Sequence, residues 1–173
     1  HTGFKGSWLS LWLKQLGAKV NGIALDPEIY PNLFDILSLS DLVNDNRQDI
    51  RDQTNTTKFL IKIDPDIIIH MAAQPLVRKA YHNPILTYET NVMGTANVLE
   101  AARKCNSLKS IVVVTSDKCY ENLETENAYV ETSQLGGYDP YSSSKACTEH
   151  VASSYYRSYF MEKGVGMATV RAG

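Results

Sequence analysis

The chain has 173 residues, of which 43% are hydrophobic and 21% charged, with a formal net charge of −2. These values are typical of one globular domain with a sizeable core, and they exclude a disordered chain, a coiled coil and a collagen-like chain. No apolar run approaches the roughly 20 residues of a membrane span, and the charge balance gives no electrostatic case for nucleic acid. We therefore expect neither a membrane nor a nucleic acid as partner.

Three cysteines, Cys105, Cys119 and Cys147, stand far apart and form no CxxC pair. Any disulfide would leave one of them over, which favours a reducing compartment. No signal peptide is visible after His1, so we expect a cytoplasmic protein.

Helical and strand patterns alternate along the chain. A helix is predicted over Ser7–Gly17, because apolar residues recur there at helical spacing. The elements that follow are a strand over 19–25, a short strand before Asp49, a strand over 66–71, a helix over 84–104, a strand over 109–115, a helix over 142–163 and a strand over 165–171. The runs 67–69 and 111–114 are continuously apolar, as in parallel strands covered on both faces. The fold class is therefore α/β, a doubly wound parallel sheet of the Rossmann-like type.

The order of the elements looks truncated at both ends. The chain begins with a turn and a helix and ends just after a strand. A doubly wound sheet of this type has its first strand at the centre. We therefore expect residues 1–173 to be a partial NAD-binding Rossmann domain that lacks its first strand, with the C-terminal substrate domain absent.

A possible phosphate-binding loop precedes the first helix. Gly3 and Gly6 have the spacing of the last two glycines of G-x-x-G-x-x-G or G-x-G-x-x-G. Such a loop brings a pyrophosphate to the positive end of a helix, which makes Gly3, Phe4 and Gly6 candidate cofactor residues. Half a motif fits a flexible terminus with two ordinary glycines about as well.

Asp26 follows the strand over 19–25, roughly 20 residues beyond the glycines, where an acid can bond the adenosine ribose. A carboxylate repels a 2′-phosphate, and positions 27–34 hold no Arg or Lys to bind one. This pattern favours NAD over NADP, with a simple turn acid as the alternative. Asp49 and Ile50 are further candidates that would bracket the adenine, although a solvated loop is nearly as good an interpretation.

Tyr141 and Lys145 stand four residues apart at the start of a predicted helix, so they share a face. An adjacent ammonium stabilises a phenolate, which can then act as a base near neutral pH. Tyr159 and Lys163 have the same spacing, but only Tyr141 follows a loop, residues 136–140, that can face a ligand. The second pair is interpreted as packing.

A polar tetrad, Thr115-Ser116-Asp117-Lys118, follows the buried strand over 111–114. In open α/β sheets the ligand crevice lies outside the carboxyl ends of the strands. A hydroxyl, an acid and an amine there are well placed for proton transfer. Together with Tyr141 and Lys145, this predicts a catalytic site rather than an ordinary turn.

Five stretches together resemble the extended short-chain dehydrogenase/reductases, the NAD-dependent epimerase/dehydratase family. They are HTGFKGSWL, HMAAQPLVRKAY, TNVMGTANVLEA, VTSDKCYEN and GGYDPYSSSKACTEH. Related dehydratases of dTDP-glucose and GDP-mannose typically carry Thr-Asp-Glu where this chain has Ser116-Asp117-Lys118, so the resemblance is strongest to members that act on CDP-glucose. The departures are the missing first strand and first glycine, the absent substrate domain, and the less typical stretch over 122–130.

The resemblance implies a dehydration of CDP-glucose or a similar nucleotide sugar, with bound NAD recycled. Tyr141 would take the proton of the sugar 4-hydroxyl, Lys145 would support it and hold the nicotinamide ribose, and Ser116 would bond the same hydroxyl. Lys118 would act as base at C5 and Asp117 as acid at the C6 hydroxyl. The resemblance further implies a homodimer in the full-length form and a role in deoxysugar and O-antigen biosynthesis.

Weaker assignments also rest on the resemblance. Ala72, Ala73, Gln74 and Thr115 would line the cofactor site, with a tight turn as the alternative for Gln74. Arg78, Tyr81 and Asn91 would lie toward the sugar, Asn91 as a support of the active-site loops. The histidines share no metal-ligand spacing, so no metal site is expected.

Two other functions stay open. A sugar-nucleotide 4-epimerase, or a dehydratase acting on another nucleotide sugar, would use the same fold, and Asp117 with Lys118 disfavours the epimerase. A non-catalytic dinucleotide-binding protein is disfavoured by the joint presence of Ser116, Tyr141 and Lys145.

Overall fold

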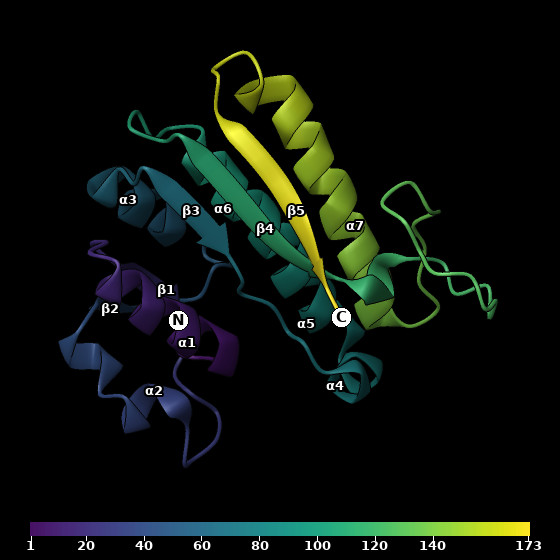
Figure 1. Ribbon diagram of the computed structural model, residues 1–173, viewed down its shortest axis with the longest axis horizontal. Coiled ribbons are helices and arrows are strands. Elements are labelled where there is room, and N and C mark those ends of the chain that lie inside the picture. The colour runs from purple at the N-terminus through teal and green to yellow at the C-terminus, as the bar shows by residue number, and fades with distance from the viewer.

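The computed structural model describes residues 1–173 and contains two parallel sheets flanked by helices (Figure 1). The smaller sheet pairs β1 (Asn21–Ala24) with β2 (Asn44–Arg47). The larger has the order β3 (Ile67–His70), β4 (Ser110–Ser116) and β5 (Gly166–Ala172). All pairings are parallel, which confirms the predicted α/β class and each predicted strand with small changes at its ends.

Seven α-helices and four short 3-10 or π-helical segments accompany the strands. The α-helices are α1 (Phe4–Gln15), α2 (Leu33–Ile36), α3 (Gln53–Ile63), α4 (Val77–His82), α5 (Pro84–Tyr88), α6 (Gly94–Ala102) and α7 (Pro140–Tyr155). The shorter segments are the 3-10 turns η1 (Leu39–Asp41) and η3 (Asp117–Cys119) and the π-helical turns η2 (Glu89–Met93) and η4 (Tyr156–Phe160). The predicted helix over 84–104 is therefore α5, η2 and α6 in succession. None of the helices combines the length and apolar composition that a membrane crossing requires.

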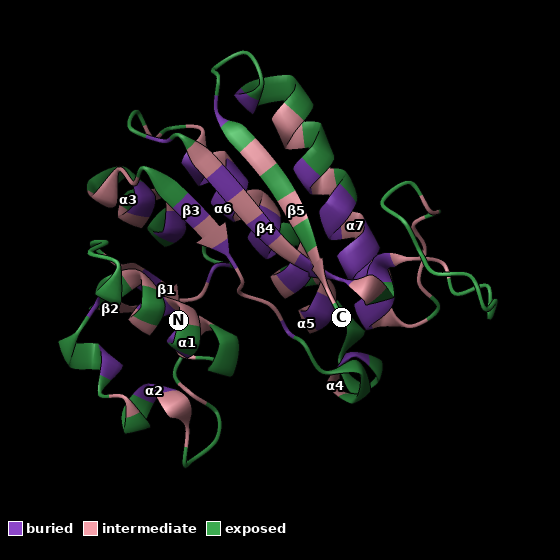
Figure 2. Ribbon diagram, in the orientation of Figure 1, coloured by how far each residue is buried: buried purple, intermediate pink, exposed green.

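The main core lies between the three-stranded sheet and a layer formed by α3, α6 and α7. Leu99 of α6, Ile111 and Val113 of β4, and Phe160 at the end of η4 are almost completely buried. Figure 2 shows buried residues running along β4, α6 and α7. The core therefore fixes the end of β4 relative to the start of α7.

Within residues 1–173, helices cover one face of the larger sheet more completely than the other. Ile67 of β3 is 58% exposed, and Val170 of β5 is also exposed. The physical reason is the handedness of the connections: successive right-handed crossovers from β3 to β4 to β5 place their helices on one face of the sheet. The helix α1 packs against α2 beside the smaller sheet instead.

The first helix forms as expected, but its apolar residues are not its buried ones. It begins at Phe4 rather than Ser7, and Trp8 and Trp12 are exposed. The buried side chains are Ser7 and Ser10. Small side chains on the inner face of α1 allow the helix to lie close to the turn that precedes it.

Candidate active site

The first turn of α7 is fixed by its own sequence. The side chain of Asp139 accepts hydrogen bonds from the backbone N–H groups of Tyr141 (2.9 Å) and Ser142 (3.1 Å), and Pro140 occupies the first helical position. An aspartate N-cap followed by proline is a strong helix start. The helix therefore begins at Pro140 rather than at Ser142, and Tyr141 is buried in its first turn.

A close backbone approach explains Gly137 in the loop before α7. Its φ is +132°, and a Cβ at this position would lie 2.4 Å from the backbone nitrogen of Ser143. Only glycine fits such a conformation and such a contact. The loop can therefore pass directly over the start of the helix that carries Tyr141.

Lys145 lies one turn further along α7, on the same side as Tyr141. Its Nζ atom is 6.0 Å from the centre of the Tyr141 ring and donates to the carbonyl oxygen of Val114 (3.4 Å). Burial lowers the pKa of Lys145 to about 8, against the opposing effect of the Cys119 and Glu149 charges. A lysine poised near neutral pH beside a tyrosine is suited to proton exchange with it.

The end of β4 carries the predicted acid and amine, and η3 packs against α7 there. The Ser116 hydroxyl donates to Oδ1 of Asp117 (3.1 Å) and accepts from the backbone N–H of Lys118 (3.2 Å). The Lys118 ammonium donates to Oδ2 of Asp117 (3.1 Å). The structure therefore brings Ser116, Asp117 and Lys118 together as a hydrogen-bonded group at a strand end, as predicted.

Asp117 is an ionised carboxylate in this arrangement. Partial burial would raise its pKa, but the hydrogen bonds from Lys118 and Ser116 and the Lys118 charge outweigh burial and hold the pKa below its usual range. The side chains of Asp117 and Lys118 are 44% and 59% exposed. The acid and the base that were predicted separately are thus one solvent-accessible ion pair.

Glu149 is a buried site residue that the sequence did not reveal. Its carboxylate accepts hydrogen bonds from Thr115, from Thr169 (2.9 Å) and from Arg171 (3.0 Å). Although burial opposes ionisation, these bonds hold the pKa of Glu149 below its usual range. The Thr115 hydroxyl proton is thus donated to Glu149, and its assignment as a cofactor residue stays a prediction.

Arg171 extends this network to the segment after Lys118. Its Nη1 atom donates to the Tyr120 hydroxyl (2.9 Å) and to the carbonyl oxygen of Glu131 (3.0 Å), and its guanidinium lies over the Tyr120 ring. Tyr120 in turn stacks on Tyr129 at 4.8 Å between ring centres. Residues 116–118 are thus held on one side by Thr115 and on the other by Tyr120. The only signal available in the sequence was the position of Glu149 four residues after Lys145 on α7.

The loop after β3 is organised by Asn91 of the π-helical turn η2. Its amide accepts from the backbone N–H of Gln74 (2.7 Å) and donates to the Gln74 carbonyl (3.1 Å) and the Ser144 hydroxyl (2.9 Å). Asn91 is buried and fully engaged, so its assignment to the sugar site is wrong, whereas its role as a support of the loops fits. Gln74 is likewise buried, with its side chain bonded to Leu76 and Thr87 rather than open to a cofactor.

The remaining residues of this region stay predictions. Ala72 and Ala73 are half-buried in the loop after β3. Arg78 and Tyr81 are exposed on α4, which packs against α7. Their positions allow contact with a molecule at the strand ends.

The second Tyr–Lys pair is confirmed as packing. The Arg103 guanidinium lies 3.8 Å from the centre of the Tyr159 ring, and Lys163 Nζ donates to the Arg103 carbonyl (2.8 Å). The Tyr159 ring also contacts the Tyr155 ring in a tilted arrangement, with 5.3 Å between the ring centres. Tyr159 and Lys163 lie beyond the end of α7, remote from Tyr141.

The turn before α1 has room for an anion. No side chain caps the helix at Gly3, and a Cβ on Gly3 would meet nothing within 4 Å. A Cβ on Gly6 would lie 2.9 Å from the Cα of His1, so this position requires glycine for the helix to approach the turn. Phe4 is exposed at the start of α1. The uncapped N–H groups and the open space at Gly3 together fit a pyrophosphate.

Asp26 directly follows Leu25 at the end of β1, where the hydroxyl of Thr2 donates to the Leu25 carbonyl (2.9 Å). The structure therefore places Asp26 beside the turn that carries Gly3. Asp49 is held by Arg51, and the resulting hydrogen bonds lower its pKa. It lines a shallow pocket with Arg51, Asp52, Glu89 and Met93.

The assignment of Ile50 to the adenine site is wrong for its side chain. Ile50 is buried in the core, where its Cδ1 atom would lie 2.5 Å from a Cβ placed on Gly94. Its carbonyl oxygen is also used, because Asn97 donates to it (3.0 Å). The alternation of burial after β2 turns Asp49 outward and Ile50 inward.

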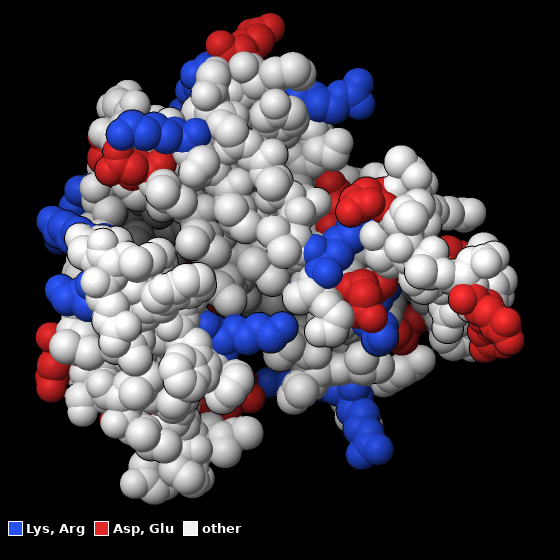
Figure 3. Space-filling model, viewed as in Figure 1, with Lys and Arg blue, Asp and Glu red and all other residues white.

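Charged side chains of both signs are interspersed on the face drawn in Figure 3, and the surface between them is largely uncharged. No single-sign patch dominates this face. The ion pairs named above account for part of the pairing.

Comparison with known proteins identifies the family. Residues 1–168 match the family model described as GDP-mannose 4,6 dehydratase. The chain belongs to this family. The CDP-glucose 4,6-dehydratase of Salmonella typhimurium is a relative that is 51% identical over 178 residues, covering 100% of this chain and 50% of the relative. The CDP-paratose 2-epimerase of Salmonella typhi is 32% identical over 83% of this chain and 51% of its own length.

Solved structures of the same fold agree with this membership. The dTDP-glucose 4,6-dehydratase of Streptomyces venezuelae, crystallised with NAD and TYD bound, matches 98% of this chain and 52% of its own with a TM-score of 0.79 at 26% identity. The UDP-glucose 4-epimerase of Thermus thermophilus in complex with NAD gives a TM-score of 0.80 at 27% identity, with the same coverage. This chain thus spans about half the length of the family relatives that it matches.

Proposed function

We propose that the full-length protein is an NAD-dependent hydro-lyase that converts CDP-D-glucose to CDP-4-keto-6-deoxy-D-glucose and water. The observation that carries this proposal is the Asp117–Lys118 pair, 3.1 Å apart at the end of β4, next to the helix that bears Tyr141 and Lys145. An oxidation at C4 needs only the tyrosine and lysine, whereas loss of water needs an additional acid and base. The relative that shares 51% identity, a CDP-glucose 4,6-dehydratase, supports CDP-glucose as the substrate.

NAD is the cofactor in this proposal, and the residues present fit it. The open, uncapped turn at Gly3 suits the pyrophosphate, and Asp26 lies beside that turn to bond the ribose. When bound, NAD supplies the acceptor for the C4 hydride and the source of the hydride for C6. The relatives crystallised with NAD support this choice.

Tyr141 and Lys145 serve the oxidation. The Tyr141 phenolate accepts the proton of the C4 hydroxyl, and the Lys145 ammonium, 6.0 Å from the ring centre, stabilises the phenolate. The Ser116 hydroxyl donates to Asp117 Oδ1 in this structure, and it would turn its proton to the same substrate oxygen when the sugar is bound. Because the pKa of Lys145 is about 8, the lysine can pass a proton on near neutral pH.

Asp117 and Lys118 serve the elimination. The C4 ketone acidifies the C5 proton, which the Lys118 amine removes, while the Asp117 carboxyl gives a proton to the departing C6 hydroxyl. One proton moved across the 3.1 Å contact, from Lys118 Nζ to Asp117 Oδ2, converts the observed ion pair into this base and this acid. Exclusion of water by the bound sugar favours the neutral forms, because desolvation disfavours charge.

The competing activity is a 4-epimerisation of the same kind of substrate. The similarity of the fold to the UDP-glucose 4-epimerase favours it as much as a dehydratase. The Asp117–Lys118 pair supports dehydration instead, since epimerisation removes no water and needs no such acid and base. A dehydratase of another nucleotide sugar would use all the residues named above.

We propose that the chain is the NAD-binding part of a longer protein with a separate substrate domain, and that this protein is a homodimer. The exposed residues Ile85 and Met93, on the α5–η2 segment, offer an apolar helical face for the dimer contact. The cysteines are all free, which supports a cytoplasmic location.

Single substitutions in the full-length protein separate oxidation from elimination. Asp117→Asn should lower dehydration of CDP-glucose by roughly 10²–10⁴-fold, the usual contribution of a positioned proton donor. Enzyme-bound NADH should stay detectable in a single turnover, because the C4 oxidation uses neither Asp117 nor Lys118. Tyr141→Phe should suppress both NADH formation and dehydration, and Lys118→Met should block washout of the C5 proton.

Asp41→Asn, an exposed carboxylate on η1, is the matched control and should leave turnover unchanged. Dehydration at the normal rate by Asp117→Asn would rule out the assigned acid.

A further inference from the structure

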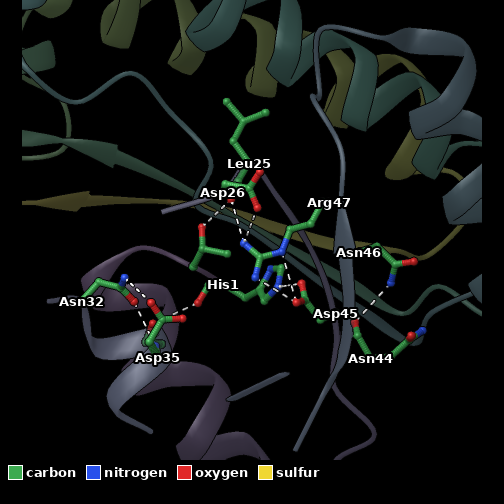
Figure 4. A network of polar contacts seen from close by, with 11 residues as sticks. His1, Leu25, Asp26, Asn32, Asp35, Asn44, Asp45, Asn46 and Arg47 are labelled. Carbon is green, nitrogen blue, oxygen red and sulfur yellow. Dashed lines mark hydrogen bonds and ion pairs between the residues drawn. The ribbon is translucent and has the colours of Figure 1, made fainter. Parts of the chain in front are cut away.

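A positively charged side chain, that of Arg47, lies beside Asp26, where the adenosine ribose is expected to bind. It comes from β2, whereas the residues that directly follow Asp26, positions 27–34, include no Arg or Lys. Arg47 ends β2, which runs parallel to β1 with Arg47 opposite Ala24. Its Nη1 atom lies 3.5 Å from Oδ1 of Asp26 and donates to the Leu25 carbonyl (3.3 Å). Figure 4 shows the guanidinium between the end of β1 and Asp45. The absence of Arg and Lys from positions 27–34 therefore does not leave this site without a positive charge.

The Arg47 guanidinium is fixed by several contacts, whereas the Asp26 carboxylate beside it is largely exposed. Asp45 accepts two hydrogen bonds from Arg47, from Nε (3.1 Å) and from Nη2 (2.9 Å), and the Phe34 ring lies 4.6 Å below the guanidinium carbon. The Arg47 side chain is 31% exposed and that of Asp26 86% exposed. Nη1 is thus the part of Arg47 that faces the position of the ribose, and Asp26 is its only side-chain partner there.

We infer that Arg47 determines the specificity for the dinucleotide. Its guanidinium could bind the 2′-phosphate of NADP, but Asp26 occupies it and repels the phosphate. This inference rests on the proposed function, because it assumes that a dinucleotide binds at the end of β1. The exclusion of NADP then depends on Asp26 alone.

The charges around Arg47 explain why a substitution of Asp26 alone would change the preference between NAD and NADP. Asp26 and Asp45 surround one guanidinium, so the group carries a net negative charge and repels a phosphate. His1 lies on the far side of Asp45, with Nε2 2.7 Å from Oδ1. Removal of Asp26 leaves the charges of Arg47 and Asp45 balanced, and the Leu25 carbonyl is then the one partner that Nη1 keeps. A planar guanidinium with free N–H groups is the preferred partner of a phosphate.

Calorimetric titration of the full-length protein, freed of bound dinucleotide, with NAD and with NADP tests the inference. The variants are Asp26→Ser, Asp26→Ser/Arg47→Gln and Asp26→Ser/Arg47→Lys. Asp26→Ser should bind NADP at least about tenfold more tightly than the unmodified protein and NAD more weakly. Arg47→Gln should abolish the gain in the Asp26→Ser background, and Arg47→Lys should keep part of it.

Glu28→Gln is the matched control, because this carboxylate lies two residues further on and pairs with Lys79 rather than with Arg47. It should leave both affinities unchanged, and thermal unfolding of each variant checks that the fold is retained. The inference is overturned if Asp26→Ser gains no affinity for NADP, or if the gain survives Arg47→Gln. An unmodified protein that binds neither dinucleotide would overturn the proposed function itself, whereas NAD binding without the NADP gain would overturn only the role of Arg47.

Discussion

At the residue scale, the burial of Lys145 affects both the stability of the fold and the protonation of the site. Lys145 is buried within the first turns of α7, and its ammonium has one hydrogen-bond partner, the carbonyl oxygen of Val114. Burial without a direct carboxylate partner lowers its pKa from 10.5 to about 8. The lowered pKa is a cost to folding, because the unfolded chain binds the proton more tightly than the folded one.

Lys145→Met should therefore stabilise the domain at neutral pH. Below pH 8 the lysine is charged in both states, and the folded state carries the full penalty of roughly 3 kcal/mol. Between about pH 8 and pH 10.5 the unfolded state holds more protons, so the stability of the unmodified protein rises relative to that of the variant. Urea unfolding of both proteins at pH 7 and pH 10 measures the difference. If the difference in the free energy of unfolding between the two proteins is as large at pH 10 as at pH 7, the lowered pKa of Lys145 is contradicted.

At the scale of elements, one buried carboxylate joins α7, β4 and β5. Glu149 on α7 holds Thr115 on β4 and Arg171 on β5, and Arg171 holds Tyr120 just beyond η3. The hydrogen bonds around Arg171 raise its pKa above its usual range. Glu149 is buried and Arg171 half-buried, so loss of one partner leaves the charge of the other poorly compensated.

Glu149→Ala is expected to destabilise the domain by roughly 3–5 kcal/mol, since it leaves Arg171 without its counter-charge. The double variant Glu149→Ala/Arg171→Met should lose less than the sum of the two single variants. Denaturant unfolding of the unmodified protein, the two single variants and the double variant gives the coupling free energy between Glu149 and Arg171. If the two losses of stability simply add in the double variant, the pair does not act as a unit.

The helices and strands were largely predictable from the sequence, whereas the burial of their side chains was not. Apolar periodicity located α1, β3, β4 and α7 because it reflects local geometry. It did not show that Trp8 and Trp12 are exposed or that Ile50 is buried, because burial depends on which elements pack together. The π-helical turn at Asn91 also has no local signal.

At the scale of the whole molecule, β1 and β3 are two of the four strands that have a hydrogen-bonded neighbour on only one side. β1 pairs only with β2, β3 only with β4, and the two sheets share no hydrogen bonds. Ile67 on β3 and Leu25 after β1 are exposed apolar residues near these edges. We propose that a further parallel strand of the full-length protein lies between β1 and β3, as the order of a doubly wound sheet requires.

Residues 1–173 alone are accordingly expected to show no turnover of CDP-glucose. Without the strand between them, β1 with its Asp26 and β4 with its Ser116 belong to sheets that no ladder holds in register. An assay of the isolated residues beside the full-length protein checks this. Measurable turnover by the isolated residues would refute it.

The candidate site was predictable where it follows strand and helix ends, and less so where it depends on the fold. Tyr141, Lys145 and the residues 116–118 stand at such ends, so the sequence indicated them directly. Glu149 and Arg47 act on residues far away in the chain, 34 residues to Thr115 in the first case. Such contacts come from strand register and helix packing, which a single sequence does not display.

The most direct test of the central claim follows a label through the reaction. CDP-glucose deuterated at C4 is incubated with the full-length protein, and the product is analysed by NMR. A dehydratase moves the hydride from C4 to C6 within the active site, so we expect a 4-keto product whose C6 methyl group carries the deuterium. A product that keeps its 6-hydroxyl and carries the deuterium at C4 would contradict the proposal and show an epimerase instead.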